Sequence, residues 1–299
     1  MAAALGDGGG RCDVDGSALG IGMTLPAAVP LPLPLPLPLP LPITVAAAVP
    51  ASVSDTAPAI SLRDLTVSYR GHPAVHHLSG AFRAGTLTAV VGPNGAGKSS
   101  LLGALGGTIR EFEGRIERDP ALRVAYLPQA SALDRSFPVR VHEVVAMGAW
   151  ARIGNFGALR AADHAAVGEA LAAVGLSGFG QRWLGELSAG QAQRVLFARV
   201  LMQDAGVILL DEPFNAIDAR TTADLLALLH RWQREARTVI AVLHDLEQVR
   251  QHFEQVLLLA RERVAWGPTA EVLKAEHLFK ARQMAEAWDE AAPACKVSA

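Results

Sequence analysis

Apolar and polar residues begin to alternate near Ala59, and this pattern predicts where the folded part of the chain starts. Between Ile60 and Tyr69, apolar side chains occupy largely every second position, which is typical of a strand with one buried face. A turn at Gly71–Pro73 precedes a second such run from Val75 to Phe82. The opening pattern therefore predicts two consecutive strands joined by a turn.

Three continuous apolar runs further along the chain predict strands that are buried on both faces. They are Thr86–Val91, Gly206–Leu210 and Thr238–Leu243. A helix is predicted after the first run and another at about 219–236 after the second. Shorter strands are predicted at 114–116, 123–126, 256–259 and 263–266, followed by a turn at Gly267–Pro268 and a helical tail from about Ala270. This arrangement is typical of an α/β fold with a parallel sheet.

Between about 131 and 187 the pattern changes from strands to helices. Apolar residues recur at helical spacing on two faces, formed by Val141, Val144 and Val145 and by Val167, Leu171 and Val174. The segment is predicted to be a helical insertion. Its end, Leu187–Gln191, opens a further helix through Ala198, and the N-terminus of that helix is a potential anion site.

Residues 1–57 differ in composition from the rest of the chain. They are rich in alanine, glycine and proline and contain six consecutive Leu-Pro dipeptides between Leu31 and Pro42. Proline at every second position removes backbone donors and excludes helix, so an extended, disordered segment is predicted. Three interpretations stay open: a proline-rich docking segment, an unstructured spacer, or sequence upstream of the true start with Met23 as the initiator.

Composition and charge narrow the classes of function. Apolar residues make up 51% of the 299 residues, which is enough for a sizeable core. The net charge of −2 argues against a general nucleic-acid binder. Cys12 and Cys295 lie near opposite ends and indicate neither a disulfide framework nor a metal site, and the composition suits a reducing cytosol. No apolar run is long enough for a transmembrane helix, so any role at a membrane is expected to work through a partner.

The segment Gly92–Ser99 fits the phosphate-binding loop pattern G-x-x-x-x-G-K-[ST] without departure. It lies between a predicted strand and a predicted helix, as that chemistry requires. Glycines let backbone N–H groups converge on phosphate oxygens, and the helix N-terminus adds a partial positive charge. Lys98, the only lysine before Lys274, would supply a cation, and Ser99 a hydroxyl for Mg²⁺. A chance glycine-rich turn is the alternative for the loop taken alone.

Polar residues at the ends of predicted strands are the other candidates. Asp211 and Glu212 follow a buried run, at the edge where parallel α/β sheets bind ligands, so the first can hold Mg²⁺ and the second can polarise a water. His244 ends the next run, although a lone histidine is more often structural. Gln129 starts a loop after a strand. Tyr69 fits either an adenine-stacking aromatic or a core residue.

Together these segments resemble the ATP-binding cassette family over about Ala59 to Leu273. The phosphate loop, Gln129, Leu187–Gln191, the Asp211–Glu212 strand, the Asn215–Asp218 loop and His244 occur in the family's order and approximate spacing. The chain departs from the family pattern at Ala189, where glycine is usual, and at Asn215, where serine or threonine is commoner. Neither departure puts ATP binding in doubt.

The resemblance implies the fold class and the domain organisation. The fold would be α/β, a P-loop NTPase with a RecA-like α/β core, an antiparallel β subdomain and an α-helical subdomain. The ATPase domain would cover 58–275, with the helical subdomain at about 130–190. It would follow the segment 1–57 and precede a helical tail at 276–299 whose end is disordered.

The resemblance also implies roles for single residues in ATP hydrolysis. Glu212 would act as base or orient the attacking water, His244 would contact the γ-phosphate, and Gln129 would complete the catalytic set. Mg²⁺ would be held by Ser99, Gln129 and Asp211. The nucleotide-binding set would be Tyr69, Gly92, Pro93, Asn94, Gly95, Ala96, Gly97, Lys98, Ser99, Ser100, Ser188, Gly190 and Asp218.

By the same resemblance, two copies of the chain would share each nucleotide in a head-to-tail homodimer. Ser188 and Gly190 of the second copy would cover the γ-phosphate, and Asp218 would lie across the interface. The residues themselves support this in one respect, because a helix N-terminus of this kind is wasted unless it meets an anion.

Within the family, the chain resembles the ATPase subunits of bacterial zinc and manganese importers, with zinc the first choice. The carriers are Ser136–Val141, Val144–Gly148 and Leu243–Leu246, although ATPases for iron-siderophore or cobalamin import share similar segments. Implied partners are integral membrane permease subunits and, indirectly, a periplasmic or surface substrate-binding protein, with the chain at the cytoplasmic face of the inner membrane. A soluble cassette ATPase acting on ribosomes or DNA is the rival; one cassette, with a gap of only about 90 residues between its motifs, argues against it.

Two further groups of side chains have open interpretations. Phe137, Val139 and Met147 form either the apolar part of a permease contact or ordinary helical core. His72, His76 and His77 cluster in the sequence, but they are expected to be solvent-facing strand and turn residues and not a metal site.

Overall fold

The computed structural model describes residues 58–69, 72–129, 135–154, 157–215 and 217–286. The predictions for 1–57, including the Leu-Pro repeat, and for the end of the C-terminal tail lie outside the described residues. Within the described part, no helix is long and apolar enough to cross a membrane.

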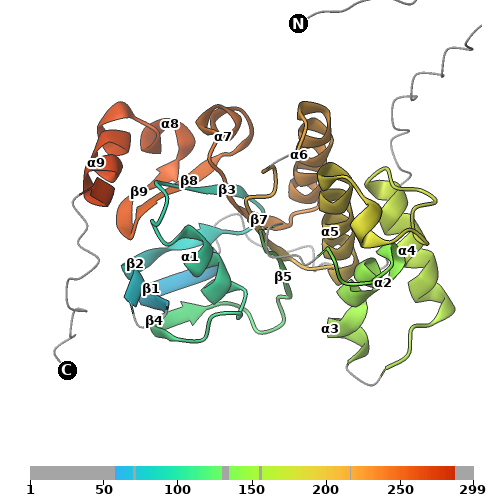
Figure 1. The fold of residues 1–299 in the computed structure, drawn as a ribbon. Helices are drawn as coiled ribbons and strands as arrows, with labels where there is room; N and C mark the ends of the chain where they lie inside the picture. Colours follow the sequence, from blue (N-terminus) through green and yellow to red (C-terminus); the bar gives the residue numbers. More distant parts are fainter. Residues whose placement is uncertain (1–57, 70–71, 130–134, 155–156, 216, 287–299) are drawn as a thin grey trace, which may run out of the picture. The chain divides into compact units, whose positions relative to one another are not determined.

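A six-stranded sheet forms the centre of the fold (Figure 1), with strand order β5-β6-β7-β3-β8-β9. Its strands are β3 Leu87–Val91, β5 Val124–Leu127, β6 Val207–Asp211, β7 Thr238–Val242, β8 Gln255–Ala260 and β9 Glu262–Pro268. All neighbouring pairs are parallel except β8 with β9. Every residue of β3, β6 and β7 is buried, which explains their continuous apolar sequences.

A second sheet of three antiparallel strands has the order β2-β1-β4. Its strands are β1 Pro58–Tyr69, β2 His72–Arg83 and β4 Phe112–Glu117. The predicted pair of strands is confirmed, but His72 and Pro73 belong to β2 and not to the turn, and Gly267 and Pro268 belong to β9. Pro73 and Pro268 fit into strands because β2 and β9 are edge strands, where a proline need not donate to a neighbour on its outer side.

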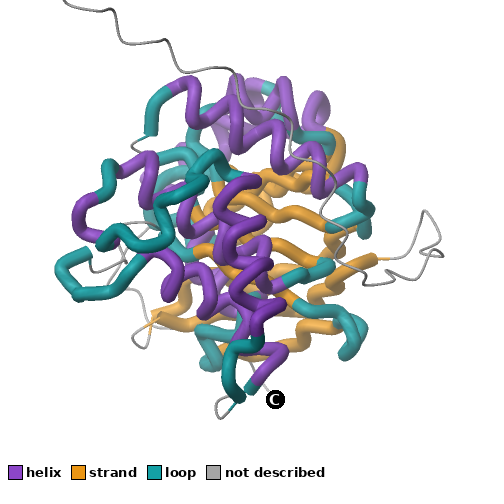
Figure 2. The backbone as a smooth tube through the Cα atoms, turned by 90° about the vertical axis from the view of Figure 1, so that its right-hand side faces the viewer, coloured by secondary structure: helices purple, strands orange, loops and turns teal. Residues whose placement is uncertain are grey.

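The helices are α1 Lys98–Leu105, α2 Val141–Ala146, α3 Trp150–Ile153, α4 Ala161–Ala173, α5 Ala189–Gln203, α6 Ala219–Arg234, α7 Leu246–His252, α8 Thr269–Val272 and α9 Ala275–Glu286, with 3₁₀ turns η2 Met147–Ala149 and η3 Leu184–Glu186. Helices α2, α4 and α5 pack together, which confirms a helical region after β5. Figure 2 shows helices covering the strands on the side that faces the viewer.

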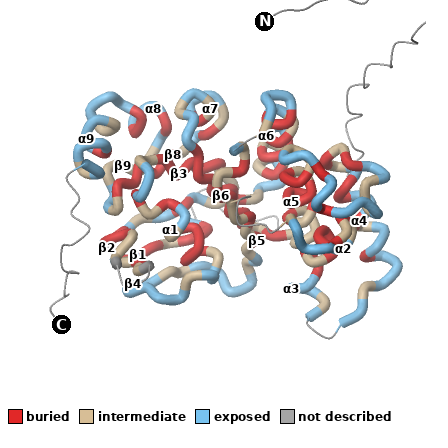
Figure 3. The backbone as a smooth tube through the Cα atoms, in the orientation of Figure 1, coloured by how far each residue is buried: buried red, intermediate tan, exposed pale blue. Residues whose placement is uncertain are grey.

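Two hydrophobic clusters cover the two faces of the central sheet. In β6, for example, Ile208 and Leu210 belong to a cluster shared with helices α2, α4, α5 and α6, whereas Val207 and Leu209 belong to a cluster shared with β1, β2 and α1. Successive strand residues point to opposite faces, so each strand contributes to both clusters. Figure 3 shows the buried strands at the centre and exposed residues on the outer helices.

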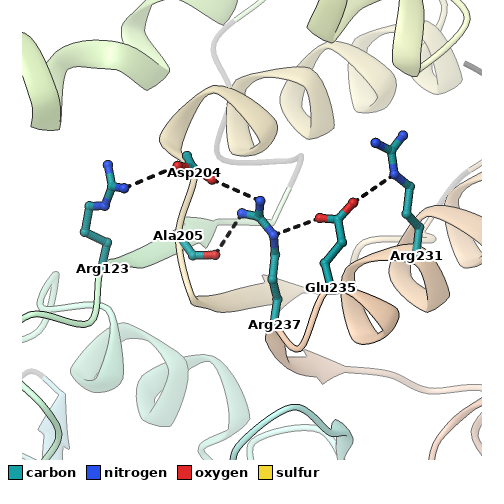
Figure 4. Close-up of polar contacts among 6 residues, drawn as sticks. All are labelled: Arg123, Asp204, Ala205, Arg231, Glu235 and Arg237. Atoms are coloured by element: carbon teal, nitrogen blue, oxygen red, sulfur yellow. Dashed lines mark hydrogen bonds and ion pairs between the residues drawn. The ribbon is translucent and has the colours of Figure 1, made fainter. Parts of the chain in front are cut away.

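An ion-pair network lies at the N-terminal ends of the parallel strands, opposite their carboxyl ends. Figure 4 shows Asp204, which follows α5, between Arg123 and Arg237, whose guanidinium groups lie 3.3 and 2.9 Å from its carboxylate. Arg237 also contacts Glu235 and donates to the carbonyl of Ala205. Since Arg123 and Arg237 immediately precede β5 and β7, the network fixes the C-terminal end of α5 to the sheet.

Candidate nucleotide site

The candidate residues lie at the carboxyl ends of four adjacent strands. Asp211 ends β6 and Glu212 follows it, while the ends of β5, β7 and β3 are followed by Gln129, His244 and the loop that begins at Gly92. Because the four strands are parallel, their ends meet at one edge. The fold therefore gathers residues that are up to 152 positions apart, from Gly92 to His244, at a single place.

The loop Gly92–Gly97 is closely surrounded by other backbone segments. A Cβ at Gly92, where φ is +151°, would lie 1.9 Å from the Leu259 carbonyl oxygen, and one at Gly97, where φ is +86°, would lie 2.2 Å from that of Ala74. The N–H of Arg261 also donates to the Ala96 carbonyl over 3.0 Å. Both glycines are therefore required by the packing of the loop itself, in addition to any ligand.

Lys98 lies at the start of α1 and is 6% exposed. Its Nζ donates to the carbonyl oxygens of Gly92, at 3.0 Å, and Pro93, at 2.8 Å. Burial lowers the pKa of Lys98, and the nearby carboxylates of Glu212 and Asp211 oppose that shift. The Lys98 ammonium group is thus bound by two neutral carbonyl oxygens of the phosphate loop. An anion bound to the loop can replace these two acceptors.

Ser99 and Asp211 meet directly, because the Ser99 hydroxyl donates to Asp211 Oδ1 over 3.0 Å. Burial raises the pKa of Asp211, while the Ser99 hydrogen bond and the charge of Lys98 partly oppose this. The Tyr126 hydroxyl, 3.5 Å from Asp211 Oδ2, is a further neighbour that the sequence pattern did not reveal. Burial and the Asp211 carboxylate raise the pKa of Tyr126, so it stays a neutral donor.

The oxygens of Ser99 and Asp211 are hard donors, which is the ligand type that Mg²⁺ prefers. Their direct contact brings a hydroxyl and a carboxylate together at the end of the phosphate loop. The donor set therefore fits a magnesium ion. In the part of the chain that is described, no three His, Cys, Asp or Glu residues cluster as a site for another metal.

Glu212 is the centre of a hydrogen-bond network. Gln129 Nε2 donates to its Oε2 over 2.6 Å, Asn215 Nδ2 donates to the same oxygen over 3.2 Å, and His244 Nε2 lies 2.7 Å from Oε1. Burial alone would raise the pKa of Glu212, but these three partners outweigh it, and the net pKa lies below the ordinary value. The Glu212 carboxylate is therefore ionised at neutral pH, and its three partners fix the orientation of the side chain.

The structure brings Glu212, Gln129 and His244 together, as their predicted shared role requires. Asn215, singled out in the sequence only as a departure from the family pattern, contacts the same carboxylate. The backbone of Glu212 is left-handed, with φ of 50°. Such a conformation is uncommon for a residue with a side chain and is concentrated at functional sites.

Ser188 and Gly190 lie at the start of α5 and not at the phosphate loop, and Gly190 lies beside Asp218. The Ser188 hydroxyl accepts from the N–H of Gln191 over 3.2 Å, so it caps its own helix. A Cβ on Gly190 would lie 3.6 Å from Asp218 Oδ2, and Asp218 in turn caps α6. In Figure 1, α5 and α1 lie apart.

The structure gives the burial of most side chains in the two open groups, and it shows that one expectation is wrong. Val139 is 8% exposed and belongs to the core, Met147 packs against the core, and Phe137 is 63% exposed. His77 is exposed as expected, but His76 is only 7% exposed and is therefore buried. The side chains of Tyr69 and His72 lie outside the described residues.

Comparison with known proteins places these features in a family. The family described as ABC transporter matches residues 75–215. The manganese transport system ATP-binding protein MntB of Halalkalibacterium halodurans is 38% identical over 76% of this chain and 92% of its own length. The zinc transport system ATP-binding protein TroB of Treponema pallidum is 38% identical over 77% of this chain and 89% of its own length.

Solved structures give the same grouping. An ABC transporter proposed to be of the metal-chelate type, in an inward-facing conformation, aligns with a TM-score of 0.67 and 29% identity over 75% of this chain and 90% of its own. The ADP conformation of MJ1267, an ATP-binding cassette of an ABC transporter, aligns with a TM-score of 0.62 over 76% of this chain and 99% of its own. At 18% identity, the second likeness concerns the fold alone.

Proposed function

The chain belongs to the ABC transporter family as an ATP-binding, ATP-hydrolysing subunit, and we propose that it drives the uptake of a divalent metal ion through a separate membrane permease. The observation that best supports ATP hydrolysis is a set of side-chain contacts beside the phosphate loop. Ser99 contacts Asp211, and Glu212 contacts Gln129 and His244. The proposed cargo rests on relatives named for manganese or zinc transport.

In the proposed reaction, the chain positions the nucleotide and the attacking water, since phosphoryl transfer needs little covalent work from a protein. The loop Gly92–Gly97, Lys98 and Ser100 bind the phosphates, and Tyr69 stacks on the adenine. Lys98 exchanges the carbonyls of Gly92 and Pro93 for phosphate oxygens. Ser99, Asp211 and Gln129 would hold Mg²⁺, which supplies positive charge to offset that of the phosphates.

Glu212 orients the attacking water and takes its proton. Two features support this role: its lowered pKa keeps it ionised, and its three partners hold both oxygens in place. Gln129 and His244 each lie within hydrogen-bond distance of Glu212, so either can move when a γ-phosphate offers another partner. His244 contacts that phosphate in the proposed complex.

Two copies of the chain share each nucleotide in the proposed working state. Ser188 and Gly190 of one copy cover the γ-phosphate held by the other, and Asp218 lies at the interface between them. The support is the position of these residues at the start of α5, away from α1 of the same chain (Figure 1). A helix N-terminus with Ser188 and glycine backbone suits an anion.

The permease holds the subunit at the cytoplasmic face of the cell membrane, and a binding protein outside delivers the ion. The proposed contact surface lies in the helical region after Gln129. Phe137 is exposed there, so it stays in this proposal, whereas Val139 is part of the core and leaves it.

Cellular metal content tests the cargo. Cells that carry Lys98→Ala in place of the native protein are grown under metal-poor conditions and analysed by elemental mass spectrometry. Selective loss of zinc or of manganese supports the metal importer and identifies its ion. Selective loss of iron favours the iron-chelate alternative, to which the metal-chelate type structure at 29% identity gives some weight. Unchanged metal content contradicts the proposal.

A further inference from the structure

Two consecutive side chains, Gln193 and Arg194, reach from α5 to the residues that follow β6. Gln193 is 1% exposed, and its Nε2 donates to the carbonyl oxygen of Pro213 over 2.8 Å. Pro213 directly follows Glu212 in the chain. The side chain of Gln193 therefore holds the backbone immediately after the residue proposed to orient the attacking water.

The orientation of the Gln193 amide follows from its partner, because a carbonyl oxygen can only accept a hydrogen bond. This places Oε1 on the other side, where it is buried and has no hydrogen-bond partner within the described part of the chain. An unpaired buried oxygen costs stability, and an apolar side chain of similar length would avoid that cost. The hydrogen bond to Pro213 thus comes with an unpaired buried oxygen that lowers the stability of the fold.

Arg194 makes a parallel connection to Asp218. Its side chain is 14% exposed and donates to the Val174 carbonyl at 3.0 Å, to Thr221 Oγ1 at 3.2 Å and to Asp224 Oδ2 at 2.8 Å. The Thr221 hydroxyl then donates to Asp218 Oδ2 over 2.8 Å. The connection from Gln193 therefore holds Pro213, next to Glu212, and the connection from Arg194 through Thr221 holds Asp218. These two positions lie on either side of Asn215 in the chain.

The opposite end of α5 is fixed as well. Asp204, just after the helix, is paired with Arg123 and Arg237 at the far edge of the sheet (Figure 4). With that end held, the first half of α5 moves only together with Pro213 and Asp218, or by breaking hydrogen bonds that are shielded from water.

We propose that Gln193 and Arg194 are positioning residues that couple the start of α5 to the segment after β6 of the same chain, so that the placement of α5 sets the rate of hydrolysis and not the affinity for ATP. Gln193 acts on the backbone next to Glu212, and Arg194 acts on Asp218 through Thr221. This inference rests on the proposed function in one respect, that the start of α5 responds to nucleotide. By this inference α5 contributes to ATP hydrolysis in two ways. Its N-terminus contacts the nucleotide held by the other copy, and its buried face contacts the residues next to Glu212 of the same chain.

The test uses Gln193→Met, which removes the donor and the unpaired oxygen while keeping the length of the side chain. Thr221→Val, which is nearly isosteric, removes the hydroxyl that links Arg194 to Asp218. In the transporter complex, each variant is expected to lower kcat about tenfold while the affinity for ATP stays within about twofold. Gln203→Met, the same substitution at the other end of α5, is the matched control and should keep the wild-type kcat.

A double variant separates coupling from general loosening of the fold. If Gln193 acts through Glu212, then adding Gln193→Met to Glu212→Gln should leave the residual rate unchanged. A further tenfold fall in that background, a wild-type kcat in Gln193→Met, or equal losses of kcat and ATP affinity would each overturn the inference.

Ser188→Arg distinguishes this inference from the shared nucleotide site. Turnover lost in Ser188→Arg but normal in Gln193→Met would refute the coupling and leave the shared site standing. The reverse result would refute the shared site, and with it the response of α5 to nucleotide, while the lower kcat of Gln193→Met would still support a role of α5 in positioning Glu212. A wild-type complex that hydrolyses no ATP would instead contradict the ATPase itself.

Discussion

Glu212 combines a left-handed backbone with three side-chain partners, and both features follow from its position one residue after β6. Asp211, the last residue of the strand, keeps its carboxylate on Ser99 and Tyr126. The sharp change of direction at Glu212 then turns the next carboxylate toward Gln129 and His244. Adjacent residues with the same chemistry thus receive opposite pKa shifts, since burial raises that of Asp211 and hydrogen bonds lower that of Glu212.

At this scale, Glu212→Gln should keep ATP binding and reduce hydrolysis by about a hundredfold or more, because the amide cannot accept the proton of the attacking water. Single-turnover hydrolysis and nucleotide binding are measured on the same preparation. A normal hydrolysis rate in this variant would show that another group activates the water.

Helix α5 illustrates how an element is held from both ends. Its start is capped by Ser188, its first half is tied to Pro213 and Thr221, and its end is fixed through Asp204. Helices α6 and α7 are also joined, because His230 Nε2 lies 3.1 Å from His252 Nδ1, and Gln233 of α6 donates to Glu254, two residues after α7. Both α6 and α7 start at the edge that carries the site, next to Asp218 and Asp245.

Asp204→Asn should lower the free energy of unfolding by about 1 kcal/mol, because it weakens two ion pairs that are partly shielded from water. Urea denaturation at low salt is the measurement, and the loss should shrink at high salt. Glu286→Gln is the control: it removes the Arg282–Glu286 pair, whose side chains are 79% and 67% exposed, and should change the stability little. Equal losses in the two variants would contradict the role given to the network.

The His230–His252 contact should make stability depend on pH. Burial, and then the neighbouring His230, lower the pKa of His252 below its ordinary value of 6.5. The folded state therefore binds fewer protons than the unfolded state below pH 6.5, so stability is complete above that pH and is lost as the pH falls toward the lowered pKa.

In His252→Gln this dependence should be weaker, since glutamine can still pair with His230 but does not titrate. The free energy of unfolding of both proteins is measured by urea denaturation between about pH 7.5 and about pH 5.5. Parallel pH profiles would exclude His252 as the source.

At the scale of the whole molecule, the proposed shared site depends on where the start of α5 lies relative to the phosphate loop of the same chain. The phosphate loop leads into α1, whereas Gly190 at the start of α5 lies beside Asp218, and α5 and α1 lie apart in Figure 1. A bulky charged side chain introduced at the start of α5 is therefore expected to leave the phosphate loop of the same chain unchanged. This separation gives the shared-site proposal its clearest consequence.

Ser188→Arg should abolish steady-state hydrolysis and leave the affinity of the isolated subunit for ATP within about twofold. Binding is measured by titration with the nucleotide, and ATP-dependent dimerisation by light scattering in the Glu212→Gln background. Continued turnover with normal dimerisation would refute a site completed by Ser188 of a second copy.

The sequence alone determined the strands, the phosphate loop and the order of the candidate residues. This was possible because buried parallel strands are continuously apolar and because a phosphate loop needs glycine at fixed spacing. Those constraints act over a few residues, so they can be recognised along the chain. The left-handed backbone at Glu212 and the buried position of His76 left no such local pattern.

Only the tertiary structure decided which candidate partners meet. The contacts of Tyr126 with Asp211 and of Gln193 with Pro213 depend on the packing of β5 and α5 against β6 and the residues after it. Val139 entered the core and Phe137 stayed outside for the same reason, although both are apolar. Apolar periodicity establishes that a residue can be buried, but the neighbouring elements, brought from distant parts of the chain, determine what covers it.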